Sequence, residues 1–493
     1  MHSLILLMQV AGVGVQHAAP LQPHPTTCYE VFVRSFYDSN GDGIGDLRGL
    51  TQKLDYIAGL GVDCVWLMPV AASPSYHGYD VTDYYKVEPD YGTNADFQAF
   101  VGAAHRHHIR VLVDLVLNHT SSQHPWFQEA LNDTASPHRN WYRWSTTAAT
   151  NWHKSPVRDE YYFGLFWSGM PDLNYENPAV LEEMKRVARF WLDSMHVDGF
   201  RLDAVRHLVE VGNEASNTAP THQVLRDFGH YVRSIAPQAY TIGEVWDNTD
   251  VILTYYPDQL DAYFAFPVSE ALMEAVRTGK TGGLIPTVLQ FQRAEPAWRW
   301  APFQRNHDQT RTLTALGNDT AGARLAATIL LTLPGVPFVY YGEEIGMTGD
   351  KPDERLRTPM QWARTSAGFT SGKPWEAAQA DSLVHNVADE DRAPGSLLKL
   401  YRRLIRLRAG DDALRDGPVA PLETGNASVL AYLRGSGSTQ VLVVANLGTT
   451  PAAPFALPGR YTLRNLVRPG AKRSSLPTLA PRQAYVYELT RRP

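Results

Sequence analysis

The sequence has few cysteines, no excess of basic charge and no long apolar run in its interior. Only two of its 493 residues are cysteines, Cys28 and Cys64, which excludes a disulfide-rich scaffold. Because Cys64 begins an apolar run, the pattern favours a buried free thiol at this position. Lys and Arg number 45 against 51 Asp and Glu, a net charge of −6 that excludes the basic surface of a nucleic-acid-binding protein. Away from the N-terminus no apolar stretch reaches the ~18 residues of a membrane-spanning helix, so we expect no membrane partner.

The first twenty residues, MHSLILLMQVAGVGVQHAAP, have the apolar centre of a secretory signal followed by small residues. They lack a Lys or Arg before this centre, and the cleavage pattern is poor. We treat residues 1–20 as a candidate signal peptide, which predicts a secreted or periplasmic protein. If the segment is not a signal, a cytoplasmic protein is expected.

The rest of the composition describes a large globular chain with unevenly distributed charge. Hydrophobic residues make up 44% and charged residues 19%, so a large core can be buried. At roughly 150 residues per domain, the chain has room for about two to four domains. Residues 421–493 hold nine Lys or Arg and two Glu, a balance of +7, which leaves −13 on residues 1–420. We therefore expect the acidic chemistry in the first 420 residues.

Short β-rich runs alternate with helical patterns along most of the chain. Two of the helical patterns are residues 180–195 and 320–333, where apolar residues recur at helical spacing. The β-rich runs are residues 29–36, 64–70, 109–118, 197–205, 240–246 and 337–344. Alternating strands and helices indicate a parallel sheet, and apolar residues on both faces of the strands suit a closed one. We predict an α/β fold, a (β/α)8 TIM barrel.

Two segments interrupt this alternation. Residues 119–172 follow a predicted strand, contain many aromatic residues and show no clean helical pattern, which predicts a small inserted domain over the barrel mouth. After the helical segment 396–410, alternating strands with Gly and Pro turns predict a C-terminal antiparallel β-sandwich at residues 413–493. The barrel is then expected to comprise residues 21–118 and 173–412.

Acidic residues lie at the carboxyl ends of several predicted strands. Asp114 lies in the third run, and Asp203 ends a later run with Arg201 two residues before it. Glu244 ends the next run, and Asp308 follows at another strand end. Because polar residues at this edge of a TIM barrel form the active site, we expect these carboxylates to converge. Converging carboxylates shift one another's pKa values, as acid–base chemistry requires, whereas a single Asp beside an Arg could be a structural ion pair.

Seven motifs occur along the chain in one family's order. They are GVDCVWLMPV (61–70), DLVLNH (114–119), MPDLN (170–174), GFRLDAVRH (199–207), GEVW (243–246), RNHD (305–308) and GVPFVYYGEE (335–344). Through them nearly the whole chain resembles the α-amylase family of glycoside hydrolases. One such motif would be a weak signal, but seven in order are specific. The resemblance implies an enzyme that binds an α-glucan oligosaccharide or polysaccharide, and we expect a monomer.

The resemblance also implies roles for individual residues. Asp203 matches the nucleophile, Glu244 the general acid/base and Asp308 the stabiliser of the transition state, while Arg201 orients the nucleophile. The expected substrate-binding residues are Tyr76, His77, Tyr79, Asp114, His119, Arg201, His207, His307 and Arg357. A retaining glycosidase needs two carboxyl groups about 5 Å apart, one to attack the anomeric carbon and one to protonate the leaving oxygen. We expect Arg201 to keep Asp203 ionised, and burial and Asp203 to raise the pKa of Glu244.

The segment DSNGDGIGD (38–46) directly follows the first predicted strand and has the alternating oxygen donors of a calcium loop. The predicted ligands are Asp38, Asn40, Asp42, the Ile44 carbonyl and Asp46. The twelfth position is Gly49 and not Glu, so the loop is not a full EF-hand. Related amylase-family proteins carry a similar loop as a structural Ca²⁺ site; a turn-rich loop without metal is the alternative. A second cation at Asn118 and the His207 carbonyl, as in many α-amylases, is a further alternative.

The subgroup signals are mixed. MPDLN lies between the QPDLN of oligo-1,6-glucosidases and the MPKLN of neopullulanases, and LRTPMQW (356–362) resembles the oligoglucosidase side through Arg357. In those exo-acting enzymes an Asp three residues before the barrel Tyr works with this Arg to close the non-reducing end. Here Tyr76 stands at that place, whereas His77 and Tyr79 match the amylase pattern. We therefore favour an α-1,4-acting, α-amylase-type hydrolase. The alternatives are an exo-acting α-glucosidase or oligo-1,6-glucosidase, a cyclomaltodextrinase or neopullulanase, and a transglucosylase.

Tyr76 leads to an expectation about the shape of the site. Without the acidic partner of Arg357, the site is expected to be an open cleft, in which Tyr76 could stack on a glucose unit. The alternative is that Tyr76 only packs its own loop.

Overall fold

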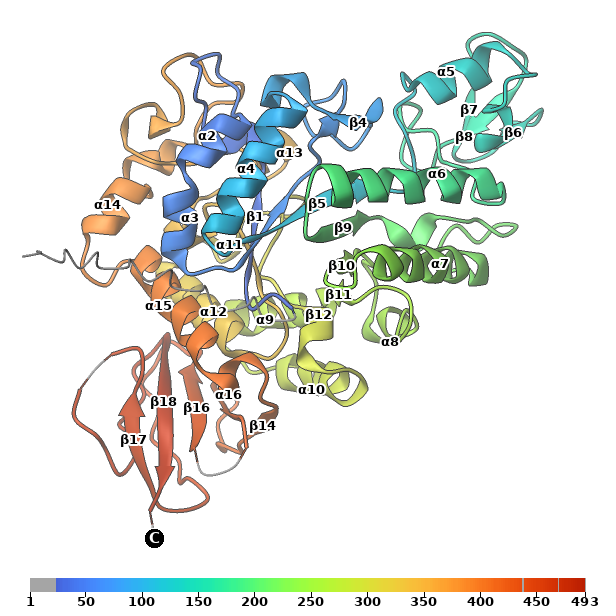
Figure 1. Ribbon diagram of the computed structural model, residues 1–493. Helices are drawn as coiled ribbons and strands as arrows, with labels where there is room; N and C mark the ends of the chain where they lie inside the picture. Colours follow the sequence, from blue (N-terminus) through green and yellow to red (C-terminus); the bar gives the residue numbers. More distant parts are fainter. Residues whose placement is uncertain (1–23, 437–438, 469, 493) are drawn as a thin grey trace, which may run out of the picture.

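The computed structural model describes residues 24–436, 439–468 and 470–492, and the candidate signal peptide at residues 1–20 lies outside them (Figure 1). Within the described residues the chain forms a helix-covered parallel sheet, a small lobe and a separate antiparallel sheet near the C-terminus. None of the helices in these ranges is long and apolar enough to cross a membrane.

Eight parallel strands form the centre of the molecule. They are β1 (Cys28–Val31), β2 (Cys64–Leu67), β5 (Arg110–Val116), β9 (Gly199–Asp203), β10 (Tyr240–Gly243), β11 (Ala262–Phe264), β12 (Trp300–Ala301) and β13 (Phe338–Tyr340). They pair in the order β12-β11-β10-β9-β5-β2-β1-β13. A parallel bridge between Phe303 and Phe338 brings the segment after β12 against β13, so the two edges of the sheet meet. The predicted TIM barrel is confirmed.

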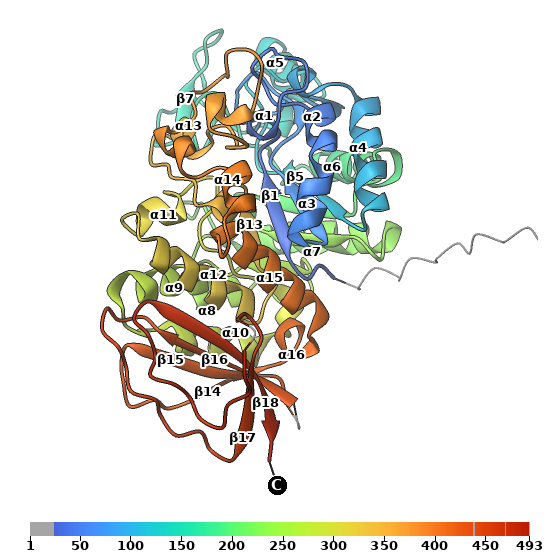
Figure 2. The same ribbon diagram turned by 90° about the vertical axis from the view of Figure 1, so that its left-hand side faces the viewer.

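Helices cover the outer surface of this sheet (Figures 1 and 2). The longer ones are α2 (Leu47–Gln52), α3 (Leu54–Leu60), α4 (Asn94–Arg106), α6 (Pro178–Arg189), α7 (Ala219–Ile235), α8 (Thr249–Leu253), α9 (Phe266–Thr278), α10 (Leu284–Ala294), α12 (Thr320–Thr332), α14 (Val387–Arg392) and α15 (Leu397–Gly410). Four-residue helices are α1 (Val33–Phe36), α11 (Thr312–Ala315), α13 (Asp353–Leu356) and α16 (Asp412–Arg415). Because helices cover one face of the strands and side chains fill the barrel interior, most of the barrel strands are buried throughout.

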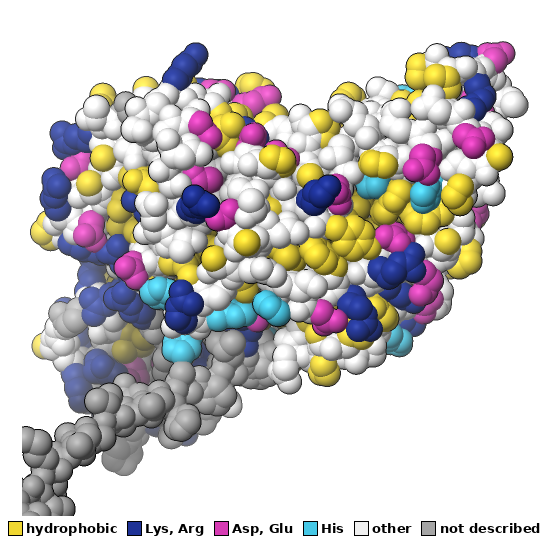
Figure 3. Space-filling view, turned by 45° about the horizontal axis from the view of Figure 1, so that its top comes forward, with side chains coloured by type: hydrophobic (Ala, Val, Ile, Leu, Met, Phe, Trp, Pro, Cys, Tyr) yellow, Lys and Arg dark blue, Asp and Glu magenta, His cyan; other side chains and the backbone are white. Residues whose placement is uncertain are grey.

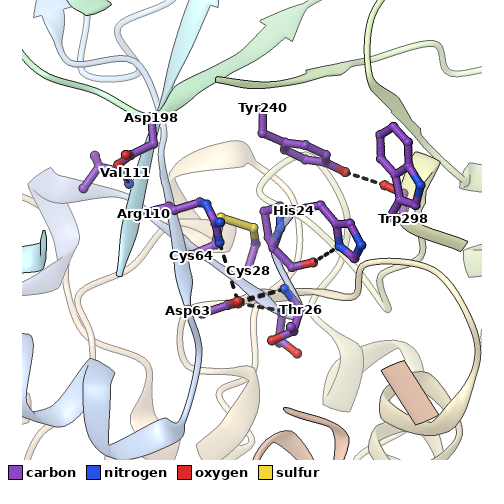
Figure 4. Close-up of a disulfide and its surroundings, with 12 residues drawn as sticks. His24, Thr26, Cys28, Asp63, Cys64, Arg110, Val111, Asp198, Tyr240 and Trp298 are labelled. Atoms are coloured by element: carbon purple, nitrogen blue, oxygen red, sulfur yellow. Dashed lines mark hydrogen bonds and ion pairs between the residues drawn. A yellow bond between two sulfur atoms is a disulfide. The ribbon is translucent and has the colours of Figure 1, made fainter. Parts of the chain in front are cut away.

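Cys28 and Cys64 form a disulfide, so the prediction of a free thiol is wrong (Figure 4). The two residues lie opposite each other in the parallel register of β1 and β2, with their Cα atoms 4.4 Å apart. Both are fully buried, as the apolar run around Cys64 indicated. Their sequence separation of 36 carries no information on strand pairing, which is why the sequence did not reveal the bond. Beside it, Asp63 accepts a hydrogen bond from the Thr26 amide at 2.9 Å.

The segment between β5 and β9 forms the lobe at the upper right of Figure 1. It contains α5 (Pro125–Asn132) and a three-stranded antiparallel sheet of β6 (Trp144–Ser145), β8 (Tyr161–Phe163) and β7 (Trp152–Lys154). Helix α5 was not expected from the sequence, because eight residues are too few for a clear helical pattern. Aromatic rings pack the lobe, with the Phe127 and Tyr162 centroids 4.9 Å apart. A short antiparallel pair, β3 (Ala71–Ala72) and β4 (Asp83–Val87), follows β2.

The C-terminal part forms a five-stranded antiparallel sheet. In pairing order its strands are β14 (Val419–Pro421), β15 (Val429–Arg434), β16 (Thr439–Asn446), β18 (Gln483–Arg491) and β17 (Tyr461–Asn465). One face packs on the barrel helices, where the Tyr432 hydroxyl lies 2.6 Å from the Thr332 hydroxyl of α12. Loop residues such as Leu476 and Leu479 cover the other face. The C-terminal antiparallel strands predicted for the β-sandwich at residues 413–493 are confirmed, and in the described residues they form one sheet with loops over its second face.

Candidate active site

A pocket of about 470 Å³ opens at the carboxyl ends of the barrel strands. Asp203 is the last residue of β9, Glu244 directly follows β10, and Asp308 lies in the loop after β12. All three line the pocket, so the structure brings the three predicted catalytic carboxylates together. Of the predicted substrate-binding residues, His77, Tyr79, His119, His207 and Arg357 also line it.

Arg201 holds three carboxylates at the floor of this pocket. Its Nη1 donates to both oxygens of Asp114 at 2.9 Å and to Asp203 Oδ1 at 2.6 Å. Its Nη2 lies 2.9 Å from Glu244 Oε2. Strand geometry explains this placement, because Arg201 and Asp203 are two residues apart on β9 and Asp114 of β5 pairs with Arg201 in register. The guanidinium is 1% exposed, and among the described residues its ion-pair partners are these three acids.

The pKa values of these acids are set mainly by burial, which raises them, and by Arg201, which opposes the shift. Burial raises the pKa of Glu244, with Arg201 opposing and Asp203 reinforcing the shift. Burial raises the pKa of Asp114 to about 7 against the charge of Arg201. It also raises the pKa of Asp203 despite the Arg201 contact, which differs from the fully ionised nucleophile expected from the sequence. The raised pKa of Glu244 favours the protonated form of this carboxyl group, which is the form that a general acid needs.

Asp308 lies in a cationic environment that keeps it ionised. Arg357 Nη2 donates to Asp308 Oδ1 at 2.8 Å, and His307 Nε2 lies 3.2 Å from Asp308 Oδ2. Burial would raise the pKa of Asp308, but His307 and Arg357 hold it far below its usual range. Burial would lower the pKa of His307, but Asp308 and Glu30 raise it to about 10. Glu30, whose Oε1 lies 2.5 Å from His307 Nδ1, was not predicted as a site residue. The sequence feature that could have indicated it is an acidic residue within an apolar strand.

The other sugar-contact candidates surround these acids. The Tyr79 ring stacks on His307 with centroids 5.7 Å apart, and its hydroxyl donates to Asp114 Oδ2 at 3.2 Å. Burial lowers the pKa of His119 to about 4, so this imidazole is neutral at neutral pH and can donate to or accept from a hydroxyl. His207 is fixed by a 2.6 Å hydrogen bond between its Nδ1 and the Ala215 carbonyl.

Tyr76 lies beside the pocket and is not among its lining residues. Its ring stacks on Trp375 with centroids 5.3 Å apart, and Arg357 Nη1 donates to its hydroxyl at 3.4 Å. Burial raises the pKa of Tyr76 to about 12, with Arg357 opposing, so the hydroxyl stays neutral. The structure therefore gives Tyr76 a packing role, as in the alternative, but with its partners Trp375 and Arg357 outside its own loop.

Seven lining residues had not been assigned to the site from the sequence: Phe166, Trp167, Met170, Ala204, Arg206, Trp246 and Asp353. Phe166, Trp167 and Trp246 are about half exposed at the pocket, and flat apolar rings of this kind can stack on sugars. Asp353 of α13 also lines the pocket, with its Oδ2 3.6 Å from Arg357 Nη2. Figure 3 shows hydrophobic side chains in a band below the projecting lobe, with charges of both signs scattered around them. Trp246 could have been found from its position two residues after Glu244, whereas no sequence pattern indicates Asp353.

The predicted calcium loop is closed by its own hydrogen bonds. Asp38 accepts from the Asn40, Gly41 and Gly43 amides at 2.8–2.9 Å, and Asp46 accepts from the Gly49 amide at 2.7 Å as the N-cap of α2. The Ile44 amide donates to Asp42 at 2.8 Å. Within the described ranges no three acidic, His or Cys side chains group as a metal site, so calcium here remains a prediction. At the alternative second site, Asn118 Oδ1 is buried without a hydrogen-bond partner among the described residues.

Comparison with known proteins places this geometry in a family. The family model for the α-amylase catalytic domain matches residues 30–417. Alpha-amylase 3 of Dictyoglomus thermophilum is 43% identical over 430 residues, 85% of this chain and 84% of that protein. The trehalose synthase/amylase of Mycolicibacterium smegmatis is 37% identical over 86% of this chain and 84% of its own length. The crystal structure of an α-amylase from H. orenii superposes with a TM-score of 0.85 at 39% identity, covering 95% of this chain and all of that one. The chain belongs to the α-amylase family of glycoside hydrolases and transglycosylases and is an α-glucan-active enzyme.

Proposed function

We propose that this enzyme hydrolyses α-1,4-glucosidic bonds in starch and maltooligosaccharides with retention of the anomeric configuration. The observation that carries the proposal is the contact of one buried guanidinium, Arg201, with both Asp203 and Glu244. A retaining glycosidase needs two carboxyl groups close together with different protonation states. A shared cation holds the two groups near each other, while burial raises the pKa of both and the charge of Asp203 raises that of Glu244 further.

The reaction follows from this arrangement in two displacements. Asp203 attacks the anomeric carbon, the glycosidic C–O bond breaks, and the proton of Glu244 goes to the leaving oxygen. Glu244 then takes a proton from water as that water attacks the same carbon and releases Asp203. Asp308, held ionised by Arg357 and His307, stabilises the positive charge that develops on the sugar ring. Tyr79 and His119 are assigned to contact the sugar at the cleavage point.

The preference for hydrolysis of internal α-1,4 bonds rests on two observations. Tyr76 occupies the place of the acid that closes exo-acting sites, so Arg357 has no acidic partner on that loop. The chain is also 43% identical to a protein named as an α-amylase. Exposed aromatic rings at the pocket suit an extended chain that continues past the cleaved bond.

One observation favours a second candidate, an exo-acting glucosidase or a transglycosylase acting on disaccharides. Asp353 lies in the pocket lining 3.6 Å from Arg357, and this pair could bind the terminal sugar hydroxyls from α13. Similarity to a trehalose synthase/amylase points the same way. The Asp353→Ala variant separates the two candidates. If the site is exo-acting, this variant should lower kcat/KM on maltose at least about tenfold more than kcat/KM on maltoheptaose. If the site is an open cleft, it should lower both values in similar proportion.

We propose further that the protein is exported and that the loop of residues 38–46 binds Ca²⁺ as a structural ion. The Cys28–Cys64 disulfide supports export, because disulfides persist in oxidising compartments. Oxygen donors at alternating positions of the loop support calcium over zinc.

Product analysis tests the proposed function. We expect maltooligosaccharides from starch and maltoheptaose, and slow or no conversion of maltose and sucrose. Conversion of maltose to an isomeric disaccharide, or glucose as the only early product from maltoheptaose, would contradict the proposal and support the second candidate. Parallel digests of pullulan and cyclodextrin test the neopullulanase and cyclomaltodextrinase alternatives.

A further inference from the structure

A second cavity, of about 290 Å³, lies where the C-terminal sheet meets the barrel. Helix α12 lines one side with Arg324 and Thr328, and the segment around the start of β18 lines the other with Arg482 and Gln483. Arg468, from the chain after β17, also lines the cavity, and the remaining lining residues are apolar: Ala321, Leu325, Leu400, Val467, Pro481 and Ala484. No acidic residue lines this cavity among the described residues, and none of its lining residues is shared with the catalytic pocket.

Arg324 is a partly buried guanidinium without an ion pair or side-chain hydrogen bond in the described part of the chain. Burial lowers its pKa, and the like charge of Arg468 lowers it further, with only Glu390 opposing. Glu390 forms no ion pair with Arg324 in the described part of the chain; its Oε2 accepts a hydrogen bond from the Leu398 amide at the start of α15. Two like charges thus face one cavity with no counter-ion within salt-bridge distance of Arg324.

The other polar groups of the cavity do not neutralise these two arginines. Arg482 donates to Asp319 at 2.9 Å, and this ion pair joins the start of α12 to the C-terminal sheet. Because the pair has no net charge, it does not offset the charges of Arg324 and Arg468. Gln483, in the amide orientation that satisfies its neighbours, accepts from Arg468 Nη2 at 2.8 Å and donates to the Tyr485 hydroxyl at 2.9 Å. The surrounding segment is basic as a whole, because residues 421–493 carry a balance of +7.

We propose that this cavity is a binding site for a phosphate-class oxyanion, held between Arg324 of the barrel and Arg468 of the C-terminal sheet region. Guanidinium groups bind phosphate and sulfate oxygens through paired N–H donors, and two of them at one cavity suit a tetrahedral anion. Because the two arginines come from different layers, the bound anion joins the sheet to the barrel. The cavity volume leaves room for a phosphate that is free or carried on a small sugar.

The test is the melting temperature of the full chain with increasing sodium sulfate, sodium phosphate or glucose 6-phosphate, each against sodium chloride at the same ionic strength. Anion bound only by the folded protein raises Tm by mass action, and we expect a rise of at least about 1 °C over the chloride control below about 10 mM anion. Sulfate is included because phosphate can sequester calcium. Glucose alone is the control for the sugar at the catalytic pocket. A larger effect of glucose 6-phosphate than of phosphate identifies a phosphorylated sugar as the ligand; an equal effect identifies the free ion.

Variants locate the effect. Arg324→Gln and Arg468→Gln should each lower the apparent affinity for the anion, obtained from the rise in Tm with anion concentration, at least about tenfold. Arg464→Gln is the matched control, since Arg464 is an exposed arginine of the same sheet, paired with Glu488 and outside the cavity. Each variant is compared with itself in chloride, so a change in its own stability does not affect the result. Equal Tm in sulfate and chloride for the wild type, or an unchanged rise in Arg324→Gln, would overturn the proposal.

Discussion

Arg201 Nη2 lies 2.9 Å from Glu244 Oε2, while Nη1 of the same side chain donates to Asp203 at 2.6 Å. The proposed acid and the proposed nucleophile therefore share one cation, and a change in the charge of either acts on the pKa of the other. This coupling makes the protonation of the pair, and not only the presence of two acids, the basis of the proposed chemistry.

The first prediction concerns the two carboxylates. Asp203→Asn should lower kcat on maltoheptaose by about 10⁴-fold or more, because an amide cannot form the glycosyl–enzyme bond. Glu244→Gln should lower it by roughly 10²–10⁴-fold, because only proton transfer is lost. Steady-state kinetics with maltoheptaose and with an aryl glycoside checks both values.

The leaving group supplies the control for this prediction. An activated aryl leaving group needs no proton, so Glu244→Gln should retain more of its activity on the aryl glycoside than on maltoheptaose, and Asp203→Asn should not. Substantial starch hydrolysis by Asp203→Asn, in a protein with unchanged Tm, would show that the nucleophile is assigned wrongly.

The second prediction concerns pH. Burial raises the pKa of Asp114 to about 7, so Asp114 gains negative charge as the pH rises through neutrality. That charge competes for Arg201 and disfavours the ionised form of Glu244. In Asp114→Asn this negative charge is absent, and Arg201 interacts with Asp203 and Glu244 alone. The pKa of Glu244 should therefore fall. The basic limb of the kcat/KM profile should therefore move to lower pH; a basic limb that stays in place or moves up would contradict this assignment of Glu244 as the acid.

The third prediction concerns calcium. If the loop of residues 38–46 binds Ca²⁺, a chelator should lower the Tm of the wild type more than that of Asp42→Ala, because the ion stabilises only the folded form. Asp83→Ala is a control, since this acid lies outside the loop. Equal chelator effects on wild type and Asp42→Ala would remove the loop as the site. A chelator effect that is lost in Asn118→Ala would instead point to the second site.

The fourth prediction concerns the disulfide. Cross-linking residues 36 positions apart restricts the unfolded chain, a stabilisation of about 4 kcal/mol by loop-closure entropy. The double variant Cys28→Ala/Cys64→Ala should therefore have a lower Tm, with kcat unchanged because neither residue lines the catalytic pocket. Thiol alkylation of the denatured wild type before and after reduction checks the bond itself. Two labelled thiols without reductant would show that the bond does not form.

The sequence predicted what depends on local pattern and on motif order. Buried strands alternating with amphipathic helices indicated the barrel, and Asp203, Glu244 and Asp308 could be placed at one mouth because parallel strands end at the same edge. The motifs then indicated the family, which the comparisons confirm.

What the sequence could not predict depends on which distant residues meet. Cys28 pairs with Cys64 only because β1 and β2 are neighbours in register, and Glu30 reaches His307 across the closed barrel. Asp353 enters the pocket from a four-residue helix without any periodic signal. The raised pKa of Asp203 depends on a balance between burial and Arg201, which spacing along the strand does not reveal.

The digestion of maltoheptaose blocked at its non-reducing end, followed by proton NMR of the first products, tests the central claim most directly. An open cleft with Asp203 as nucleophile predicts that the blocked chain is cleaved internally and that each new reducing end appears first as the α-anomer. Maltose, too short to span such a cleft, should be a poor substrate in the same assay. No cleavage of the blocked chain would contradict the open cleft and favour an exo-acting site, and β-anomers as first products would contradict the double displacement itself.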